Sequence, residues 1–450
     1  MLTTDQLPSC APERQGLSSA ALIRLLDELE RGGLDPHALI VARRGHVLFR
    51  TSWAPWSAEQ PALVYSVSKT FTAFAIGLLE ADGAIDLDAP VERYLGGENP
   101  NGITVRHLLT MNTGHSREQT LSLPFSVPTL LTTPPAAAPG SSFAYNSPAS
   151  YALSAVVEAV SGLSLTGLLR GRVFDPLGIG QRWWIPLDGI DQGFSGLHLE
   201  IDDLARTGIM LADGGRFRGR QVIPATYVEA MARPWSDNRD EDGDPDGDPD
   251  GDWSLGYGFQ VWRSRHGFRL DGAYGQFVLV MPETGVVVAY QGATTRTHET
   301  LNALWRLVES FHDDEVAPSA DDSARLAERA ATRDSWISRH ALAASDPMPD
   351  PEAWMLADAA DGGWLLTTPL GEVAVPQDRW SHAVLGTREQ SLAVAARGER
   401  AGDDVLVHLV VPTSPHRAII SRGAGGLSVA WHTTPLWHPS LGTLTVPEGT

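Results

Sequence analysis

The chain has 450 residues, of which 42% are hydrophobic and 20% charged, and its formal net charge is −21 at pH 7. This composition is typical of a soluble protein with two or three domains, and the negative charge argues against nucleic acid and anionic membranes as partners. The single cysteine, Cys10, cannot form an internal disulfide. We find no signal pattern at the N-terminus and no apolar stretch long enough to cross a bilayer, so we expect a cytoplasmic protein.

The first hundred residues predict a helix, a hairpin and a second, buried helix. Residues 17–31 are amphipathic, with Ser18 or Ser19 in position to cap the helix. Two β-rich runs at 38–42 and 46–50 predict a hairpin. The apolar run at 71–79 then predicts a helix of the core.

This core helix carries the only lysine of the chain, Lys69. Ser66 precedes it by three residues, which places both side chains on one helical face. A serine hydroxyl needs a base to take its proton, and a desolvated lysine with a lowered pKa can be that base. Arginine stays protonated, so one lysine among arginines favours a catalytic pair over an incidental core lysine.

A second candidate group follows a long irregular segment. Residues 105–111 predict a short helix, and the Pro-, Ser-, Thr- and Gly-rich stretch 112–142 is typical of a functional loop or lid. Tyr145 comes just before a helix expected at 151–160. Its phenol could give or take a proton if a nearby cation lowers its pKa, although a packing role fits the residue equally well. Ser147 or Asn146 could hydrogen-bond to Lys69.

A helix is expected at 201–212, and an acidic stretch follows at 236–252. Two D-x-D-x-D-G frames begin there, at Asp242 and Asp246, and this pattern can open a calcium loop. The twelfth positions are Trp253 and Tyr257, where calcium needs a carboxylate. We therefore interpret the stretch as a solvated loop, and we expect neither a metal nor a cofactor.

The next segments predict strands at 255–262, 268–281 and 286–291, and then a helix at 300–311. In the second of these strands, Asp271 is followed by Gly272, which permits close backbone approach. The N–H of Ala273 could then join that of Ser66 in an oxyanion hole. A simple β-bulge is the alternative reading of this segment.

The sequence divides into three predicted parts. Residues 1–313 form the main domain, residues 314–345 a linker with a possible helix at 323–344, and residues 346–450 a small β-rich accessory domain. The tryptophans of this last part are expected in its core. A structural role for it, covering the site or forming a dimer, is one hypothesis.

The order of these segments resembles the serine β-lactamase and DD-peptidase-like superfamily, especially its class C β-lactamase-related esterases and peptidases. The resemblance covers roughly residues 13–311. The stretch 105–114 is similar to that family's I-T-x-x-x-L-L-x-H-T-S-G segment, and three motifs match: Ser66-Val67-Ser68-Lys69, Tyr145-Asn146-Ser147 and Leu270-Asp271-Gly272.

The resemblance implies an α+β fold, in which an antiparallel sheet flanked by helices lies beside an all-helical subdomain. It also implies a covalent acyl-serine intermediate, with Ser66 as nucleophile, Lys69 as its base and Tyr145 as acid–base partner. The protein would then be a serine hydrolase of a small ester or amide.

Two motifs depart from the family pattern. Ser147 stands where the second motif usually has Asn, and Leu270-Asp271 replaces the usual Lys-Thr of the third. In β-lactamases that lysine and threonine help to hold the substrate carboxylate, which Asp271 would repel. We therefore expect a poor β-lactamase that prefers a neutral ester or amide, or a substrate that carries an amine.

Two other functions remain open. The same acyl-enzyme could pass its acyl group to an alcohol or amine, because access and desolvation select the acceptor. A non-catalytic binding protein on the same fold is the second, and the retained Ser66, Lys69 and Tyr145 argue against it. The sequence has no G-x-S-x-G, no H-E-x-x-H and no cysteine cluster, so neither an α/β-hydrolase triad nor zinc chemistry is indicated.

Overall fold

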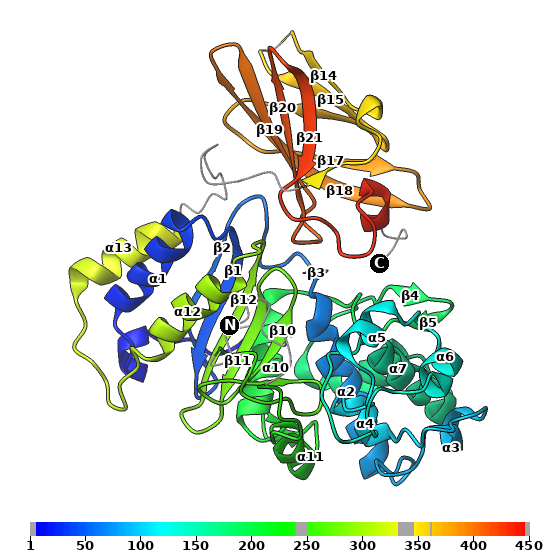
Figure 1. Ribbon diagram of the computed structural model, residues 1–450. Helices are drawn as coiled ribbons and strands as arrows, with labels where there is room; N and C mark the ends of the chain where they lie inside the picture. The colour runs from blue at the N-terminus through cyan, green and yellow to red at the C-terminus, as the bar shows by residue number, and fades with distance from the viewer. Residues whose placement is uncertain (1–5, 240–250, 332–345, 361, 446–450) are drawn as a thin grey trace. The chain divides into compact units, whose positions relative to one another are not determined.

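The computed structural model describes residues 6–239, 251–331, 346–360 and 362–445 (Figure 1). The chain forms two compact units that alternate along the sequence. One comprises residues 1–9, 40–48 and 64–289, and the other comprises residues 10–39, 49–63 and 290–450. The predicted domain boundaries at 313 and 345 stay a prediction, and the calcium frames at Asp242 and Asp246 begin outside the described residues.

The main sheet has six strands in the order β2-β1-β12-β11-β10-β9. Strand β10 is antiparallel to both neighbours, with Phe268 opposite Val280 on one side and Arg263 on the other. Strands β1, β11 and β12 are buried along their whole length, as their continuous apolar runs predict. The predicted hairpin at 38–50 is confirmed. The bounds are β1 Pro36–Arg43, β2 His46–Ser52, β9 Trp262–Arg263, β10 Phe268–Gly272, β11 Gln276–Met281 and β12 Val286–Gly292.

Two of the strand predictions need correction. The run 268–281 is two strands rather than one, because Tyr274 and Gly275 have φ values of 65° and 85° and turn the chain back. The run 255–262 enters a strand only at its last residue. Gly256 and Gln260 have φ values of 106° and 58°, which extended backbone does not allow.

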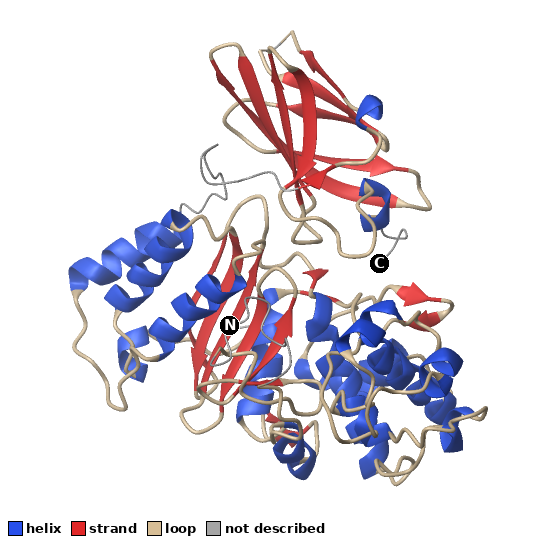
Figure 2. Ribbon diagram, viewed as in Figure 1, coloured by secondary structure: helices blue, strands red, loops and turns tan. Residues whose placement is uncertain are grey.

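A cluster of helices forms the other part of the first unit (Figure 2). Helix α2 is buried from Ser68 to Leu79 and packs against α7 and α8, which is typical of a helix that is apolar on all sides. The predicted helix at 105–111 is confirmed, but the predicted loop at 112–142 contains α5 and α6. The bounds are α2 Ser68–Ala81, α3 Glu92–Leu95, α4 Val105–Leu109, α5 Arg117–Ser122, α6 Val127–Thr132, α7 Ser147–Ser161, α8 Leu165–Leu169 and α9 Asp175–Leu177.

Helix α10 connects this cluster to the sheet. It spans Ile201–Ala212, as predicted, and packs against β11. The remaining elements of the unit are short: the 3-10 turn η2 Tyr65–Val67, the π-helical turn η3 Arg170–Phe174, α11 Ala225–Met231, β4 Pro186–Leu187, β5 Ile190–Asp191, β6 His198–Leu199, β7 Arg216–Phe217 and β8 Arg220–Gln221.

In the second unit, α1 (Ser19–Arg31) packs against α12 (Thr297–Val308) and α13 (Ala320–Ala331). The side chain of Ser18 caps α1 by accepting from Ala21 N–H. The short elements η1 (Pro12–Gln15) and β3 (Ala62–Leu63) belong to this unit as well. The predicted helix at 323–344 is confirmed as far as Ala331, and its remainder lies outside the described residues.

The C-terminal residues of the second unit are β-rich, as predicted (Figure 2). One sheet has the order β13-β21-β20-β19-β18-β17 and the other the order β14-β15-β16. Trp354, Trp364 and Trp431 are core residues, whereas Trp380 is partly exposed. The bounds are β13 Asp346–Pro347, η4 Pro351–Ala353, β14 Met355–Asp358, β15 Trp364–Thr368, β16 Gly371–Val375, β17 Ser381–Gly386, β18 Ser391–Ala401, β19 Asp404–Val410, β20 Arg417–Gly423, β21 Gly426–Trp431 and η5 Leu441–Leu444.

Candidate active site

Ser66 lies in a tight turn rather than in the helix that follows it. It is the middle residue of η2, which leads directly into α2, and its side chain is partly exposed. Just before the turn, Val64 N–H donates to the carbonyl of Leu197 at 3.0 Å. Tyr65 has a φ of 48°, a strained conformation for a bulky residue that persists only where the surroundings impose it. The protein thus holds strained backbone directly beside the candidate nucleophile.

Lys69 is buried, with 2% of its surface exposed, and its amine contacts the candidate nucleophile. Nζ lies 2.9 Å from Ser66 Oγ and 2.9 Å from the carbonyl oxygen of Phe194. Burial lowers the pKa of Lys69 to about 7, although the nearby charge of Asp271 opposes this shift. The neutral amine is therefore accessible at neutral pH, and its lone pair can accept the proton of Ser66.

Tyr145 completes this group of side chains. It hydrogen-bonds to the side chain of Ser66, and Lys69 Nζ lies 4.8 Å from the centre of its ring. The indole of Trp262 stacks on the ring of Tyr145, with 5.5 Å between ring centres and 20° between planes. Burial raises the pKa of Tyr145 above its usual value, despite the bond to Ser66 and with a further contribution from Asp271. The phenol thus stays protonated at neutral pH.

The two residues after Tyr145 serve the helix that follows. Asn146 is fully buried and is the N-cap of α7, because its Oδ1 accepts from Ala149 N–H at 3.0 Å. Its Nδ2 donates to Thr113 Oγ1 at 3.0 Å, so both ends of the amide are engaged away from Lys69. Ser147 begins α7 and is partly exposed.

The end of β10 approaches the nucleophile turn through Gly272. A Cβ at this position would lie 2.3 Å from the carbonyl oxygen of Val64, far inside van der Waals contact. Strand β10 packs against η2, as the oxyanion-hole prediction requires of this segment. Ala273 follows in the turn between β10 and β11, partly exposed. Its role as an oxyanion donor stays a prediction.

Asp271 is engaged by a buried arginine. Arg269 Nε lies 2.8 Å from Asp271 Oδ2, and the side chain of Trp253 also hydrogen-bonds to this carboxylate. Burial raises the pKa of Asp271, while Arg269 acts in the opposite direction. The charge that we expected to act on substrate is therefore partly balanced within the protein.

The segment 193–197 is the part of the site that sequence reasoning missed. It runs along α2, where the carbonyl of Gly193 accepts from Thr72 Oγ1 at 2.8 Å and the N–H of Leu197 donates to Ser68 Oγ at 3.2 Å. Between them, the carbonyl of Phe194 accepts from Lys69. Because Phe194 acts through its backbone carbonyl, its side chain gives no sequence signal for this role. The available signal was the pair of closely spaced glycines, Gly193 and Gly196, which both have positive φ in the structure.

One residue of the segment 112–142, Phe125, lies close to the region around Lys69. Phe125 stacks on Phe194, with 4.1 Å between ring centres and 11° between planes. The ring of Phe194 also lies near the amine of Lys69, at 5.9 Å. Aromatic side chains thus line two sides of the lysine, which favours apolar groups on a bound molecule.

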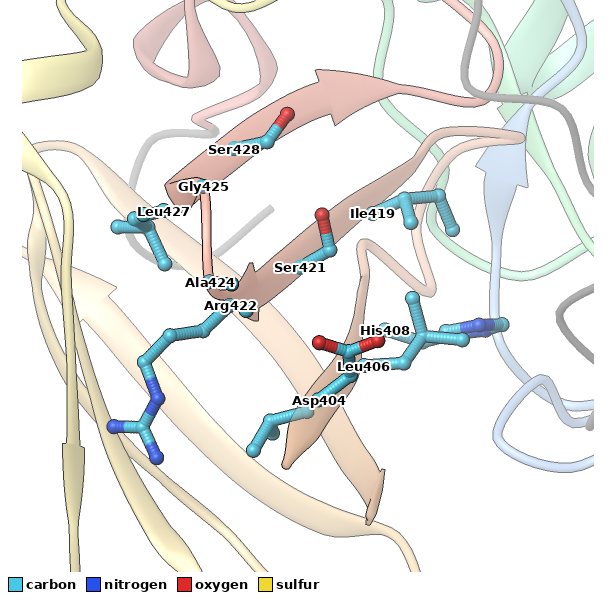
Figure 3. A pocket seen from close by; sticks show the side chains of 13 residues that line it. Asp404, Leu406, His408, Ile419, Ser421, Arg422, Ala424, Gly425, Leu427 and Ser428 are labelled. Atoms are coloured by element: carbon cyan, nitrogen blue, oxygen red, sulfur yellow. The ribbon is translucent and has the colours of Figure 1, made fainter. Parts of the chain in front are cut away.

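A separate hollow of about 450 Å³ lies on the C-terminal sheet (Figure 3). Leu406 and Ile419 form a small apolar cluster there, and Asp404, Ser421 and Ser428 add polar groups from β19, β20 and β21. None of the predicted site residues lines this hollow. A second one, of about 610 Å³, includes Arg44 and Arg216 and is likewise separate from those residues.

Within the described ranges, no group of three or more His, Cys, Asp or Glu side chains is placed to hold a metal ion. Asp252, the described acid inside both calcium frames, pairs with Arg265 at 2.6 Å. No single helix of the described residues has the length and apolar composition to cross a bilayer. One pair, Ser147–Ser161 and Leu165–Leu177, meets both criteria jointly but is bent by 67°.

Comparison with known proteins identifies the family of the chain. The family described as Beta-lactamase matches residues 22–313, about two thirds of the chain. The chain belongs to the Beta-lactamase family. Membership of this family establishes the fold but neither the reaction nor the substrate.

Two curated relatives align with parts of the chain. The chain is 39% identical over 70 residues to an esterase/beta-lactamase, LipL, from Mycobacterium tuberculosis, an alignment that covers 15% of this chain and 16% of LipL. It is 27% identical over 220 residues to the 6-aminohexanoate-dimer hydrolase of Paenarthrobacter ureafaciens, covering 43% of this chain and 56% of that protein. These alignments span at most about half the length of either relative.

The fold likeness extends into the C-terminal residues. An octameric penicillin-binding protein homologue from Pyrococcus abyssi superposes with a TM-score of 0.52 and 17% identity, covering 91% of this chain and 99% of that one. The superposition covers more of this chain than the family match to residues 22–313 does. The structural likeness therefore includes residues of the β-rich C-terminal part. The predicted α+β fold with an antiparallel sheet, helices and a C-terminal β-rich part is confirmed.

Proposed function

We propose that the protein is a serine hydrolase that forms an acyl-enzyme on Ser66 and cleaves a small ester or amide. The observation that carries this proposal is the 2.9 Å contact between Ser66 Oγ and the amine of Lys69. The amine has a pKa of about 7, lowered by burial, and so can act as a general base at neutral pH.

In the first half of the reaction, Lys69 takes the proton of Ser66 as Oγ attacks the substrate carbonyl carbon. The bond to the leaving group then breaks, and Tyr145 protonates that group as it departs. The products of this half are the acyl-serine, a protonated Lys69, a phenolate at Tyr145 and the free alcohol or amine.

In the second half, water attacks the acyl-serine and gives one proton to the Tyr145 phenolate. Lys69 returns its proton to Ser66 as the acid leaves, which restores the starting state. Backbone N–H groups of Ser66 and Ala273 are the proposed donors to the developing oxyanion.

The charges around the site favour a neutral substrate over a carboxylated β-lactam. The only lysine of the chain is already used as the base, and position 270, where the family pattern has a lysine, is a fully buried leucine. Asp271 lies beside it, paired with Arg269. Of the two relatives, LipL is named as both an esterase and a beta-lactamase, and the other is named as a hydrolase of the 6-aminohexanoate dimer.

The test compares p-nitrophenyl acetate and butyrate with a chromogenic cephalosporin that carries a free carboxylate. We expect kcat/KM for the esters to be at least 100-fold higher, and to fall at least 1,000-fold in Ser66→Ala and Lys69→Arg. Ser122→Ala is the matched control, since Ser122 is exposed and lies outside the site. Equal rates on both substrate classes would refute the substrate preference, and full ester activity in Ser66→Ala would refute the mechanism.

The same assay also distinguishes an acyltransferase and a non-catalytic binding protein from a hydrolase. A transferase would release acid slowly and form a new ester when an alcohol acceptor is added. A binding protein would give neither turnover nor a covalent adduct in the wild type.

A further inference from the structure

A fully buried ion pair joins the start of β1 to the C-terminal sheet. Arg417, the first residue of β20, donates through Nη2 to Asp35 Oδ1 at 2.7 Å, and neither side chain is exposed. Although burial acts to raise it, Arg417 and His37 hold the pKa of Asp35 below its usual value. The carboxylate thus stays charged opposite the guanidinium. A buried pair of this kind is costly to break, because each partner leaves an uncompensated charge behind.

The ion pair is surrounded by groups that fix its geometry. Arg417 Nη1 lies 2.8 Å from His408 Nδ1, and its guanidinium carbon lies 5.2 Å from the centre of the Trp56 ring. That ring also stacks on His37, with 3.3 Å between ring centres. Trp56 therefore links the ion pair to the segment in which it stands, residues 53–63.

The loop 411–416, just before Arg417, makes two hydrogen bonds to that same segment. The indole N–H of Trp56 donates to the carbonyl of Ser414 at 3.3 Å, and the backbone N–H of Leu63 donates to the carbonyl of Thr413 at 2.9 Å. The loop is itself rigidly tied, since His416 N–H donates to Ser414 Oγ and Val411 N–H to the carbonyl of His416. A stiff C-terminal loop thus holds the segment.

Leu63 is only three residues from Ser66, and the strained Tyr65 lies between them. Strained backbone relaxes unless its neighbours on both sides are fixed. On the far side, α2 is buried and fixed along its length. On the near side, the fixed points include the bond of Val64 to Leu197 and the bond of Leu63 to the 411–416 loop.

We propose that Arg417 is a positioning residue for the nucleophile: by docking on Asp35 it holds the 411–416 loop against residues 53–63, and so keeps Ser66 in register with Lys69. The C-terminal β-rich part thereby takes part in catalysis without contributing a reacting group. The catalytic half of this inference rests on the proposed function, whereas the structural half does not.

The test uses the full chain and two readouts. The first is the rate at which a fluorophosphonate probe labels Ser66, and the second is amide hydrogen exchange of residues 56–66. We expect Arg417→Met to slow labelling at least tenfold and to speed exchange in this segment at least tenfold, with a lower kcat and a KM within twofold for p-nitrophenyl butyrate. Asp35→Asn combined with Arg417→Met should recover part of the labelling rate, because no lone buried charge remains.

Arg422→Met is the matched control. Arg422 lies on the same strand, but it pairs with Asp358 at 2.7 Å and donates to the carbonyl of Leu356 instead. Its loss should leave labelling and exchange within twofold of wild type. If Arg417→Met is insoluble, Trp56→Phe decides instead, since it removes the N–H that binds Ser414 and keeps an aromatic ring at this position. We expect at least threefold slower labelling from that change.

Faster exchange with unchanged labelling would overturn the positioning role, and unchanged exchange would overturn the docking itself. If the wild type is not labelled at all, the proposed function fails, but hydrogen exchange in the Arg417 and Trp56 variants still decides whether the loop holds the segment.

Discussion

The central residue, Lys69, shows how burial produces a base from a side chain that is normally charged. Its amine is desolvated by burial and lies within hydrogen-bond distance of Ser66 Oγ and the carbonyl of Phe194. Its pKa falls to about 7. Arginine could not be neutralised in this way, which accounts for one lysine in a chain that otherwise uses arginine.

A pH profile follows directly from this pKa. Because only the neutral amine can accept a proton, kcat/KM for p-nitrophenyl acetate should rise about tenfold per pH unit below pH 7 and level off above it. Tyr145 must be protonated, and its raised pKa keeps the plateau flat to at least pH 9. The profile is measured from pH 5 to 9. A flat profile, or a midpoint near the usual lysine value, would contradict the role of Lys69.

Gly272 offers a second test at the level of one residue. In Gly272→Ala the new methyl group would meet the Val64 carbonyl at 2.3 Å, so β10 must move away from the nucleophile turn. We expect a loss of roughly 1–3 kcal/mol of stability and at least a tenfold lower kcat. Gly171→Ala is the control, since nothing lies within 4 Å of its Cβ. Urea denaturation and ester kinetics measure both effects, and wild-type kcat in Gly272→Ala would exclude a role for this close approach.

At the scale of elements, the start of α7 positions Tyr145. Asn146 caps the helix and also binds Thr113, so it fixes the backbone directly after the phenol. Asn146→Ala should therefore cost about 1–2 kcal/mol of stability and lower kcat at least tenfold. Ser18→Ala removes the cap of α1 and should cost about 1 kcal/mol with kcat unchanged. Equal kcat in the two variants would mean that Asn146 acts on stability alone.

The elements also show what the sequence could and could not predict. Helix α1 follows from apolar periodicity and its serine cap, and helix α2 from a continuous apolar run. The pairing of Ser66 with Lys69 follows from their spacing of three residues. The run 268–281 is divided by a turn in which Tyr274 has a positive φ. Tyrosine rarely adopts this conformation, so the residue type does not predict the turn. Phe194 acts through its carbonyl, and every residue has one, so its place beside Lys69 depends on tertiary structure.

At the scale of the molecule, buried histidines predict acid sensitivity. Burial lowers the pKa of His37 to about 4 and those of His198 and His416 to about 3. The unfolded chain binds protons near pH 6.5 that the folded chain does not, so stability is complete above that pH and falls below it, by about 1.4 kcal/mol per pH unit for each histidine. The raised pKa of Asp271 acts in the opposite direction.

The urea midpoint should therefore fall steadily between pH 6.5 and pH 5. His198→Gln, which removes one of these titrating groups, should reduce that fall. Denaturation series at pH 7, 6 and 5 measure the effect. The same midpoint at pH 7 and pH 5 would show that these imidazoles are protonated in the folded protein.

The most direct test of the whole account is intact-protein mass spectrometry after incubation with a fluorophosphonate probe, followed by peptide mapping. The account predicts one adduct per chain, on Ser66, that is absent in Ser66→Ala and forms at least 1,000-fold more slowly in Lys69→Arg. An adduct on another residue, no adduct in the wild type, or undiminished labelling of Lys69→Arg would contradict it.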